Sequence, residues 1–361
     1  MIEKHKPLAL VLACLCVCLP QACAAVGSSG AGDKDLPTSG VGPFRKLDGD
    51  ETLGIAPFVL DDGAKEWKDP AVLPADPESG DARVILFAAG KVKNREVIVR
   101  TRAEDGRSFF GAETGKTPRI VLQAEDDAEQ VQAPSAARIG GRIFLYWADG
   151  QGIRIAVSDD GLTFERRPGR ALDMDSRAAW EKSPPSAPSV AVYPDGRVRM
   201  IYAAGGFFGE AESLDGFSFT RLGEDPIFGP SPERFASTAP GEKPLFDAAR
   251  VDDPCLVPRV TPAGRLHIRV LYTATDAAGA TAIGFASRYG DVGPLVRQAQ
   301  PVYAVNKRER GPALLEWPGG ALLYVSQVRQ STPDTKYFAI AAAVSPANLR
   351  LPRATTYADS P

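Results

Sequence analysis

The 361-residue sequence predicts an all-β fold built from five repeated units. Two series of short motifs support this prediction. Asp-Gly turns recur at Asp105, Asp160 and Asp215, with a step of about 55 residues. Prolines that open short apolar strands recur at similar steps, and they are Pro70, Pro134, Pro188, Pro254 and Pro312. Five units of three or four short antiparallel strands close most simply into a five-bladed β-propeller.

Each unit has the same order of elements along the chain. The proline-led strand comes first, because proline at the first residue of a strand costs no ladder hydrogen bond. A glycine-rich turn leads to an apolar second strand with an aromatic residue, at 84–89, 143–147, 200–204, 270–273 and 322–325. A third strand then ends at the Asp-Gly turn, since Asp-Gly tolerates the positive φ of tight hairpins. This last turn is clear in three units and weaker at 287–290 and 345–348.

Residues 44–66 precede the first unit and are expected to supply a strand that completes the last blade and closes the ring. The alternative is a sixth blade, in which residues 44–47 pair with residues 56–60. Long stretches with helical periodicity are missing from the sequence, which favours the all-β reading.

Composition excludes several classes of protein. The formal net charge of −3 gives no electrostatic basis for binding nucleic acid. Of the five cysteines only Cys255 lies outside the N-terminal segment, so no intramolecular disulfide is expected and Cys255 is interpreted as core packing. Histidine occurs only at His5 and His267, so zinc sites and Ser-His-Asp triads are poorly supported. We therefore expect no metal and no cofactor.

The N-terminus reads as a targeting segment. Charged residues precede the apolar stretch Leu8–Leu19, which is too short to span a bilayer and fits a signal peptide. Residues 1–24 are therefore predicted to be a signal peptide, 25–43 a flexible linker, and 44–361 the propeller. Ala22-Cys23-Ala24 offers a cleavage site, and Cys23 could alternatively carry the lipid of a bacterial lipoprotein. Both alternatives place the protein outside the cytoplasm, in the periplasm, at the outer membrane or in the medium.

The repeated unit resembles the five-bladed propellers of glycoside hydrolase families 43 and 32, the arabinanase, xylosidase and invertase type. The resemblance covers roughly residues 50–350 and rests on the proline-led strands, the aromatic second strands and the Asp-Gly turns. In such enzymes the blade-opening strands line a funnel and carry three carboxylates. These come from an Asp-Pro in the first blade, an Ala-Pro-Asp in the second and a Glu-x-Pro in the third.

Carried onto this sequence, the resemblance supplies only one of those carboxylates. Asp69 matches the first-blade position, whereas Ser135 and Ser186 stand where the family has Asp and Glu. Glycoside hydrolysis needs one carboxylic acid and one carboxylate, so the acid would have to come from elsewhere. The candidates are Asp253 in the fourth unit and Glu181 in the loop at 179–186. The alternatives are a strand-end cap for Asp253 and a solvated loop acid for Glu181.

The expected ligand is a glycan or oligosaccharide at the central funnel, and the expected oligomeric state is a monomer. Besides the catalytic candidates, residues beside the strand-opening prolines and nearby tryptophans are expected to bind it: Trp67, Lys68, Gln132, Ser135, Trp180, Ser186, Asp252 and Arg310. Two function classes stay open, a glycoside hydrolase with a rearranged carboxylate set and a non-catalytic propeller that binds a glycan or a protein. A sialidase-type propeller is less favoured, because Ser158-Asp159-Asp160-Gly161 is one residue too short for its Asp box.

Overall fold

The computed structural model describes residues 41–47, 58–60, 66–76, 83–109, 118–175, 178–231, 245–317, 319–332 and 335–346. These residues all belong to one compact unit, Leu36–Pro361. They form strands, turns and loops, and within them no helix is long and apolar enough to cross a membrane. The predicted signal peptide and residues 25–40 of the predicted linker lie outside the described residues.

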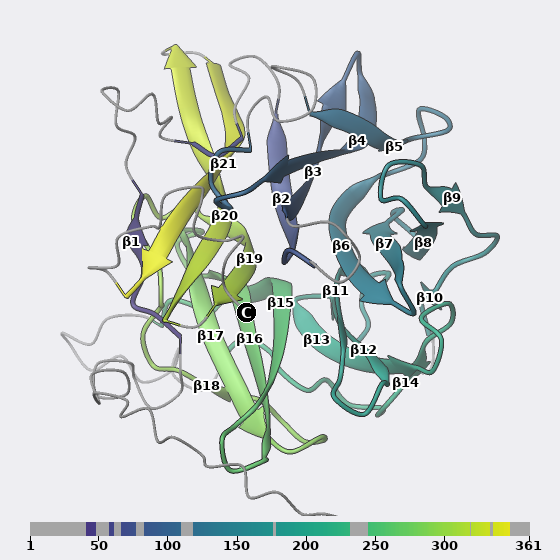
Figure 1. The fold of residues 1–361 in the computed structure, drawn as a ribbon. Helices are drawn as coiled ribbons and strands as arrows, with labels where there is room; N and C mark the ends of the chain where they lie inside the picture. Colours follow the sequence, from purple (N-terminus) through teal and green to yellow (C-terminus); the bar gives the residue numbers. More distant parts are fainter. Residues whose placement is uncertain are drawn as a thin grey trace, which may run out of the picture. The chain divides into compact units, whose positions relative to one another are not determined.

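Five antiparallel sheets surround a central channel, which confirms the predicted five-bladed propeller (Figure 1). The first blade contains β2 (Trp67–Leu73), β3 (Val84–Val92), β4 (Arg95–Ala103) and β5 (Arg119–Gln123). The second contains β6 (Gln132–Ile139), β7 (Arg142–Ala148), β8 (Gly152–Ser158), β9 (Glu165–Arg166) and β10 (Leu172–Asp173). The third contains β11 (Ser186–Val192), β12 (Val198–Ala204), β13 (Phe207–Ser213) and β14 (Thr220–Arg221).

The fourth blade contains β15 (Arg250–Val260), β16 (Leu266–Thr275), β17 (Thr281–Tyr289) and β18 (Val296–Arg297). The fifth contains β19 (Arg310–Trp317), β20 (Gly320–Thr332), β21 (Thr335–Ser345) and the N-terminal β1 (Arg45–Lys46). The innermost strands β2, β6, β11, β15 and β19 carry the five strand-opening prolines. All five blades therefore begin where the sequence predicts.

The N-terminal segment closes the ring on the fifth blade. Strand β1 pairs with β21, with Arg45 opposite Val344, and Leu60 forms an isolated bridge to Ile340. Both pieces thus lie along the same strand, β21. This confirms the predicted closure, and the alternative of a sixth blade is wrong. Closure in this way covers a strand edge that would otherwise be free to pair with another chain.

Packing begins earlier than the predicted linker boundary at residue 44. Val41 is buried and belongs to the apolar cluster between the fourth and fifth blades. The backbone N–H of Phe44 donates to the carbonyl of Val302 at 3.2 Å. Because Val41 is apolar and reaches this cluster, the last residues of the predicted linker are part of the folded domain.

The Asp-Gly turns are equivalent, as their spacing predicts. Asp105, Asp160 and Asp215 each lie between the third and fourth strands of their blade. Each carboxylate accepts the backbone N–H two residues further on, at 2.9, 2.7 and 2.9 Å respectively. The third-blade turn also docks on the second blade, because the hydroxyl of Tyr146 donates to the carbonyl of Gly216 at 2.8 Å. The turns therefore help to fix neighbouring blades to each other.

Candidate functional site

Every innermost strand carries a β-bulge at its proline. The residue before the proline and the proline itself oppose a single residue of the second strand, as Asp69 and Pro70 oppose Ala88. The residue before the proline has a positive φ in all five blades; these residues are Asp69 (52°), Ala133 (48°), Ala187 (44°), Asp253 (48°) and Gly311 (59°). A positive φ at a residue other than glycine costs about 1–3 kcal/mol. Because all five positions share the bulge and the positive φ, they are structurally equivalent around the ring. Bulges commonly re-aim side chains.

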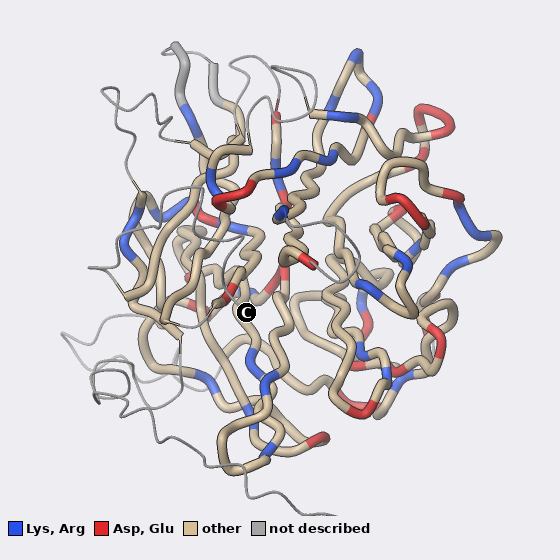
Figure 2. Tube along the Cα trace, viewed as in Figure 1, with Lys and Arg blue, Asp and Glu red and all other residues tan. Residues whose placement is uncertain are grey.

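We call this ring the mouth of the channel and define it by the two residues that precede each strand-opening proline. Its members are Lys68, Asp69, Gln132, Ala133, Ser186, Ala187, Asp252, Asp253, Arg310 and Gly311. Charged positions of both signs meet near the centre of the ring of blades (Figure 2). The first and fourth blades, which are not neighbours, supply the acidic residues Asp69, Asp252 and Asp253.

Asp69 and Asp253 lie close enough to interact electrostatically. The pKa of Asp69 is raised to about 6, with burial as the largest cause and the negative charge of Asp253 as the next. Lys68, Arg310 and a hydrogen bond from the backbone N–H of Ala133 act in the opposite direction. The two aspartates that the sequence pairs as catalytic candidates are therefore brought together.

Hydroxyl groups of the second strands hold both aspartates. The backbone N–H of Asp69 donates to Oγ of Ser326 at 2.7 Å. Oγ1 of Thr273 donates to Oδ2 of Asp253 at 2.8 Å. The Thr273 hydroxyl oxygen also accepts the backbone N–H of Gly311 at 2.9 Å. Thr273 and Ser326 are both buried. These bonds join the fourth blade to the fifth and the fifth blade to the first.

Asp252 is the third acid of the mouth. Burial raises its pKa to about 7, with the charge of Asp253 as the next largest cause. Its ion pair with Arg250 and the charge of Arg310 oppose this rise. Carboxyl groups whose pKa values are raised toward neutrality are suited to general acid–base chemistry. Within the described chain, no group of three or more His, Cys, Asp or Glu residues could hold a metal ion.

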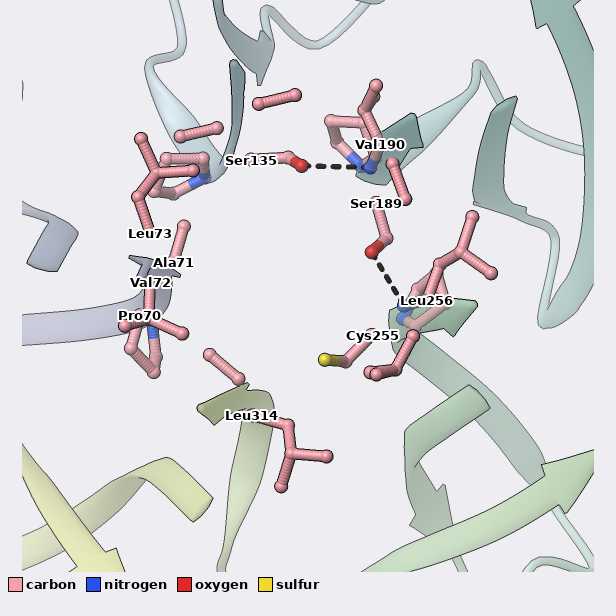
Figure 3. Close-up of a pocket in the computed structure, with 18 of the residues that line it drawn as sticks. Pro70, Ala71, Val72, Leu73, Ser135, Ser189, Val190, Cys255, Leu256 and Leu314 are labelled. Atoms are coloured by element: carbon pink, nitrogen blue, oxygen red, sulfur yellow. Dashed lines mark hydrogen bonds between the residues drawn. The ribbon is translucent and has the colours of Figure 1, made fainter. Parts of the chain in front are cut away.

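Below the mouth runs a channel of about 390 Å³ that is lined by the prolines and the residues after them (Figure 3). Its polar side chains are used to join blades. Oγ of Ser135 accepts the backbone N–H of Val190 at 3.0 Å, and Oγ of Ser189 accepts that of Leu256 at 2.8 Å. Cys255 accepts an equivalent bond from the fifth blade, and burial raises the pKa of its thiol to about 12. These bonds therefore join neighbouring blades, and the aspartates Asp69, Asp252 and Asp253 lie at the mouth.

Comparison with known proteins finds relatives of the fold only. No family model and no curated protein matches the sequence. Among solved structures, a thermostable family-43 glycoside hydrolase matches with 15% identity and a TM-score of 0.53, over 78% of this chain and 89% of that chain. A GH62 hydrolase in complex with xylotriose matches with 11% identity and a TM-score of 0.55, over 83% and 94%. A fructofuranosidase from Schwanniomyces occidentalis complexed with fructosylnystose matches with 12% identity and a TM-score of 0.56, over 83% and 60%.

This chain has the fold of the propeller glycoside hydrolases. The five-bladed propeller fold that the repeated motifs and the resemblance predict is therefore confirmed. The identities are too low to transfer an activity, so function has to be argued from the residues of the mouth.

Several residues expected to bind a ligand are bonded within the fold. Ser135 accepts a bond from the third blade, as described above. The hydroxyl of Ser186 donates to the carbonyl of Ala203 at 3.1 Å. Nε2 of Gln132 donates to Oε1 of Glu96 at 2.7 Å. Lys68 on the same strand and Arg310 on the neighbouring fifth blade act on Asp69 through their charges. Of the non-acidic candidates, these two cations are the ones whose charge acts on the acids of the mouth.

The two tryptophans named as candidates pack against other residues of the fold. Trp67 is 1% exposed and packs on Gly90 in the cluster between the first and fifth blades. Trp180 stacks on Tyr202, with ring centroids 6.0 Å apart and planes inclined by 28°. Both tryptophans lie near a blade opening in sequence; the Trp67 ring is buried against Gly90, whereas the Trp180 ring is only partly buried beside Tyr202.

Glu181 also has partners within the fold. Its carboxylate is buried, accepts the Tyr202 hydroxyl at 2.7 Å and binds Nε of Arg221 at 2.6 Å. Those partners lie on β12 and β14 of the third blade. Breaking a buried ion pair of this kind is costly, so the carboxylate is bound firmly to its own blade.

The same acid, aromatic ring and arginine recur in the neighbouring blades. In the second blade Glu129 binds Arg166 at 2.5 Å, and that guanidinium lies 5.1 Å from the centroid of the Trp147 ring. The fourth-blade copy consists of Asp247, Tyr272 and Arg297. In each case the acid comes from the loop before the innermost strand, and the arginine comes from the outermost part of the blade. Glu181 is therefore one copy of a repeated internal clamp.

Sequence reasoning missed Thr273 and Ser326, although a signal for them exists. Each is paired with the mouth residue two positions before the proline, and the five residues at this register position are Ala89, Ala148, Ala203, Thr273 and Ser326. A hydroxyl at this position occurs only in the fourth and fifth blades. That signal is the pairing register of the second strands, which is known only from the structure.

Proposed function

We propose that this protein is an exported, glycoside-hydrolase-like propeller protein that binds a glycan at the mouth of its channel and acts on it there. The observation that carries the proposal is the meeting of Asp69 and Asp253. They occupy equivalent bulged positions of non-neighbouring blades, and the charge of Asp253 raises the pKa of Asp69. Raised carboxyl pKa values at a concave site are typical of functional positions.

The proposed chemistry uses two carboxyl groups of the mouth. Cleavage of a glycosidic bond needs a carboxylic acid that protonates the leaving oxygen and a carboxylate that activates water or attacks the sugar carbon. Asp69 is the residue at the position where the resembling enzymes carry a carboxylate, and we assign it as the base or as an acceptor for a sugar hydroxyl. Asp253 is its partner. Lys68 and Arg310 would donate hydrogen bonds to hydroxyl groups of the sugar.

The fold relatives support a carbohydrate ligand, because one of the matched structures holds xylotriose and another holds fructosylnystose. A second candidate function is a binding protein without turnover, for a glycan or a protein. The observation that favours it is that Ser135 and Ser186, at two of the three positions where the resembling enzymes carry carboxylates, make hydrogen bonds within the fold.

The test is a pair of single substitutions, Asp69→Asn and Asp253→Asn. Both variants and the wild type are assayed for hydrolysis of aryl arabinosides, xylosides and fructosides, and for binding to a glycan array. The control is Asp159→Asn, because Asp159 is exposed and lies in the turn between β8 and β9. Loss of hydrolysis in both mouth variants supports the enzyme, and binding without turnover supports the binding protein. If neither variant alters a measurable activity or binding of the wild type, the proposal fails.

We also propose export, on the charged start and the short apolar stretch of the N-terminal sequence. Mass spectrometry of the protein recovered from outside the cytoplasm should find a chain that begins near Cys23 or Ala25. A lipid on Cys23 would identify the lipoprotein form, and an unmodified start would identify plain secretion. Recovery of an intact Met1 on the exported protein would refute the cleavage.

A further inference from the structure

Thr273 stands at the centre of a hydrogen-bond chain that crosses from the fifth blade to the fourth. The backbone N–H of Gly311 donates to Oγ1 of Thr273 at 2.9 Å, and that hydroxyl donates to Oδ2 of Asp253 at 2.8 Å. Thr273 is 1% exposed, so water does not compete for these bonds. The hydroxyl oxygen accepts the N–H through a lone pair, and its single proton is donated to the carboxylate.

The other mouth acids are not held in this way. Asp69 lies in the first blade, where the residue at the register position of Thr273 is Ala89. Its carboxylate instead accepts the backbone N–H of Ala133. Asp252 is bound by the side chain of Arg250, which is itself more than half exposed. Among the described acids of the mouth, Asp253 alone receives a buried hydroxyl that another blade has already oriented.

We propose that Thr273 is the positioning residue of the mouth: its hydroxyl holds the Asp253 carboxylate near Asp69 and Asp252 and thereby sets how strongly its charge acts on those two acids. The chemical use of this arrangement rests on the proposed function. The effect on Asp69 and Asp252 can be measured without any substrate, so the two ideas can fail independently.

The charges around each acid give the direction of the effect. Asp69 faces the charges of Asp253, Lys68 and Arg310. Asp252 faces those of Asp253, Arg250 and Arg310. Asp253 is thus the one anion that raises the pKa of both neighbours, while the cations lower it. Without the Thr273 hydroxyl the Asp253 side chain can rotate away from its neighbours, and the pKa values of Asp69 and Asp252 should both fall.

The experiment is a ¹³C NMR titration of aspartate side-chain carboxyl groups in the full-length folded domain, with the signals assigned by Asp69→Asn and Asp252→Asn. Thr273→Val, which keeps the shape but removes the hydroxyl, should lower both titration midpoints by on the order of one pH unit. Thr273→Ser restores the hydroxyl and should titrate like the wild type. Asp253→Asn removes the charge itself and should shift both midpoints in the same direction by at least as much.

Ser326→Ala is the matched control. Ser326 occupies the same register position in the fifth blade and accepts the backbone N–H of Asp69, so its loss should leave the midpoint of Asp252 unchanged. The proposal is overturned if a folded Thr273→Val protein keeps both wild-type midpoints, or if Thr273→Ser shifts them as far as Thr273→Val does. Thr273→Ala replaces the valine variant if the latter does not fold. If the midpoints shift as expected but glycan binding is unchanged by substitution of Asp69 and Asp253, this inference is upheld and the proposed function is refuted.

Discussion

Replacement of Glu181 by glutamine should destabilise the fold and leave the mouth intact. The side chain of Glu181 is fully buried and its partner Arg221 is 17% exposed. Removing one partner of a fully buried ion pair costs about 3–5 kcal/mol, and the partial exposure of Arg221 reduces this to about 2–3 kcal/mol. Glutamine keeps an acceptor for the Tyr202 hydroxyl, so the loss comes from the charge. Since each kcal/mol lowers the Tm of a domain of this size by about 2–4 °C, a drop of about 5–10 °C is expected.

The assay is thermal unfolding followed by circular dichroism, combined with glycan binding per folded molecule. Glu165→Gln is the control, because Glu165 is 75% exposed and meets Arg167 only at 3.9 Å, so its loss should cost less than about 0.5 kcal/mol. Asp247→Asn removes the equivalent acid of the fourth blade and should cost a similar amount to Glu181→Gln. A Glu181→Gln protein with an unchanged Tm and abolished binding or hydrolysis would refute the structural role and return Glu181 to the catalytic candidates.

Three further predictions follow from the mouth and the channel. The pKa values of Asp69 and Asp252 are raised in the folded chain, so both acids hold protons more tightly when folded. Their contribution to stability therefore falls as pH rises from about 4 to 7. Asp252→Asn should flatten this fall when urea unfolding is measured across that range. Gly311→Ala places a Cβ 3.3 Å from Cα of Asp69 at a positive φ, and a loss of about 1–3 kcal/mol is expected, with a shifted Asp69 titration by NMR. Ser189→Ala leaves the buried N–H of Leu256 without its acceptor and should cost about 1–3 kcal/mol in urea unfolding, whereas a neutral result would show that the bond between the third and fourth blades is dispensable.

The five-bladed ring could be predicted because its signals are local. A proline that starts a strand and an Asp-Gly turn have causes within a few residues, so Pro70 and Asp105 report the same elements wherever the strands pack. Closure by residues 44–66 could also be predicted from the sequence, because the last of the five units lacks one strand. The choice between this closure and a sixth blade depended on pairing with β21, which no local signal reports.

The candidate site was predictable in part. Asp69 and Asp253 share a position relative to proline, and the fivefold arrangement turns that shared position into proximity across the mouth. Trp67 and Glu181 lie as near to a blade opening in sequence, but burial against Gly90 and Arg221 decides their roles, and burial is a tertiary property. Thr273 becomes visible only once the register between first and second strands is known.

The most direct test of the central claim is a crystal structure of the protein with the oligosaccharide that binds best on the glycan array. The mouth hypothesis predicts a sugar ring above the strand-opening prolines, with a hydroxyl or the glycosidic oxygen within hydrogen-bond distance, about 2.6–3.2 Å, of the Asp69 carboxylate. Lys68 or Arg310 should contact the same ring. A glycan bound on the outer strands or the Asp-Gly turns, with the mouth empty at saturating ligand, would contradict the claim.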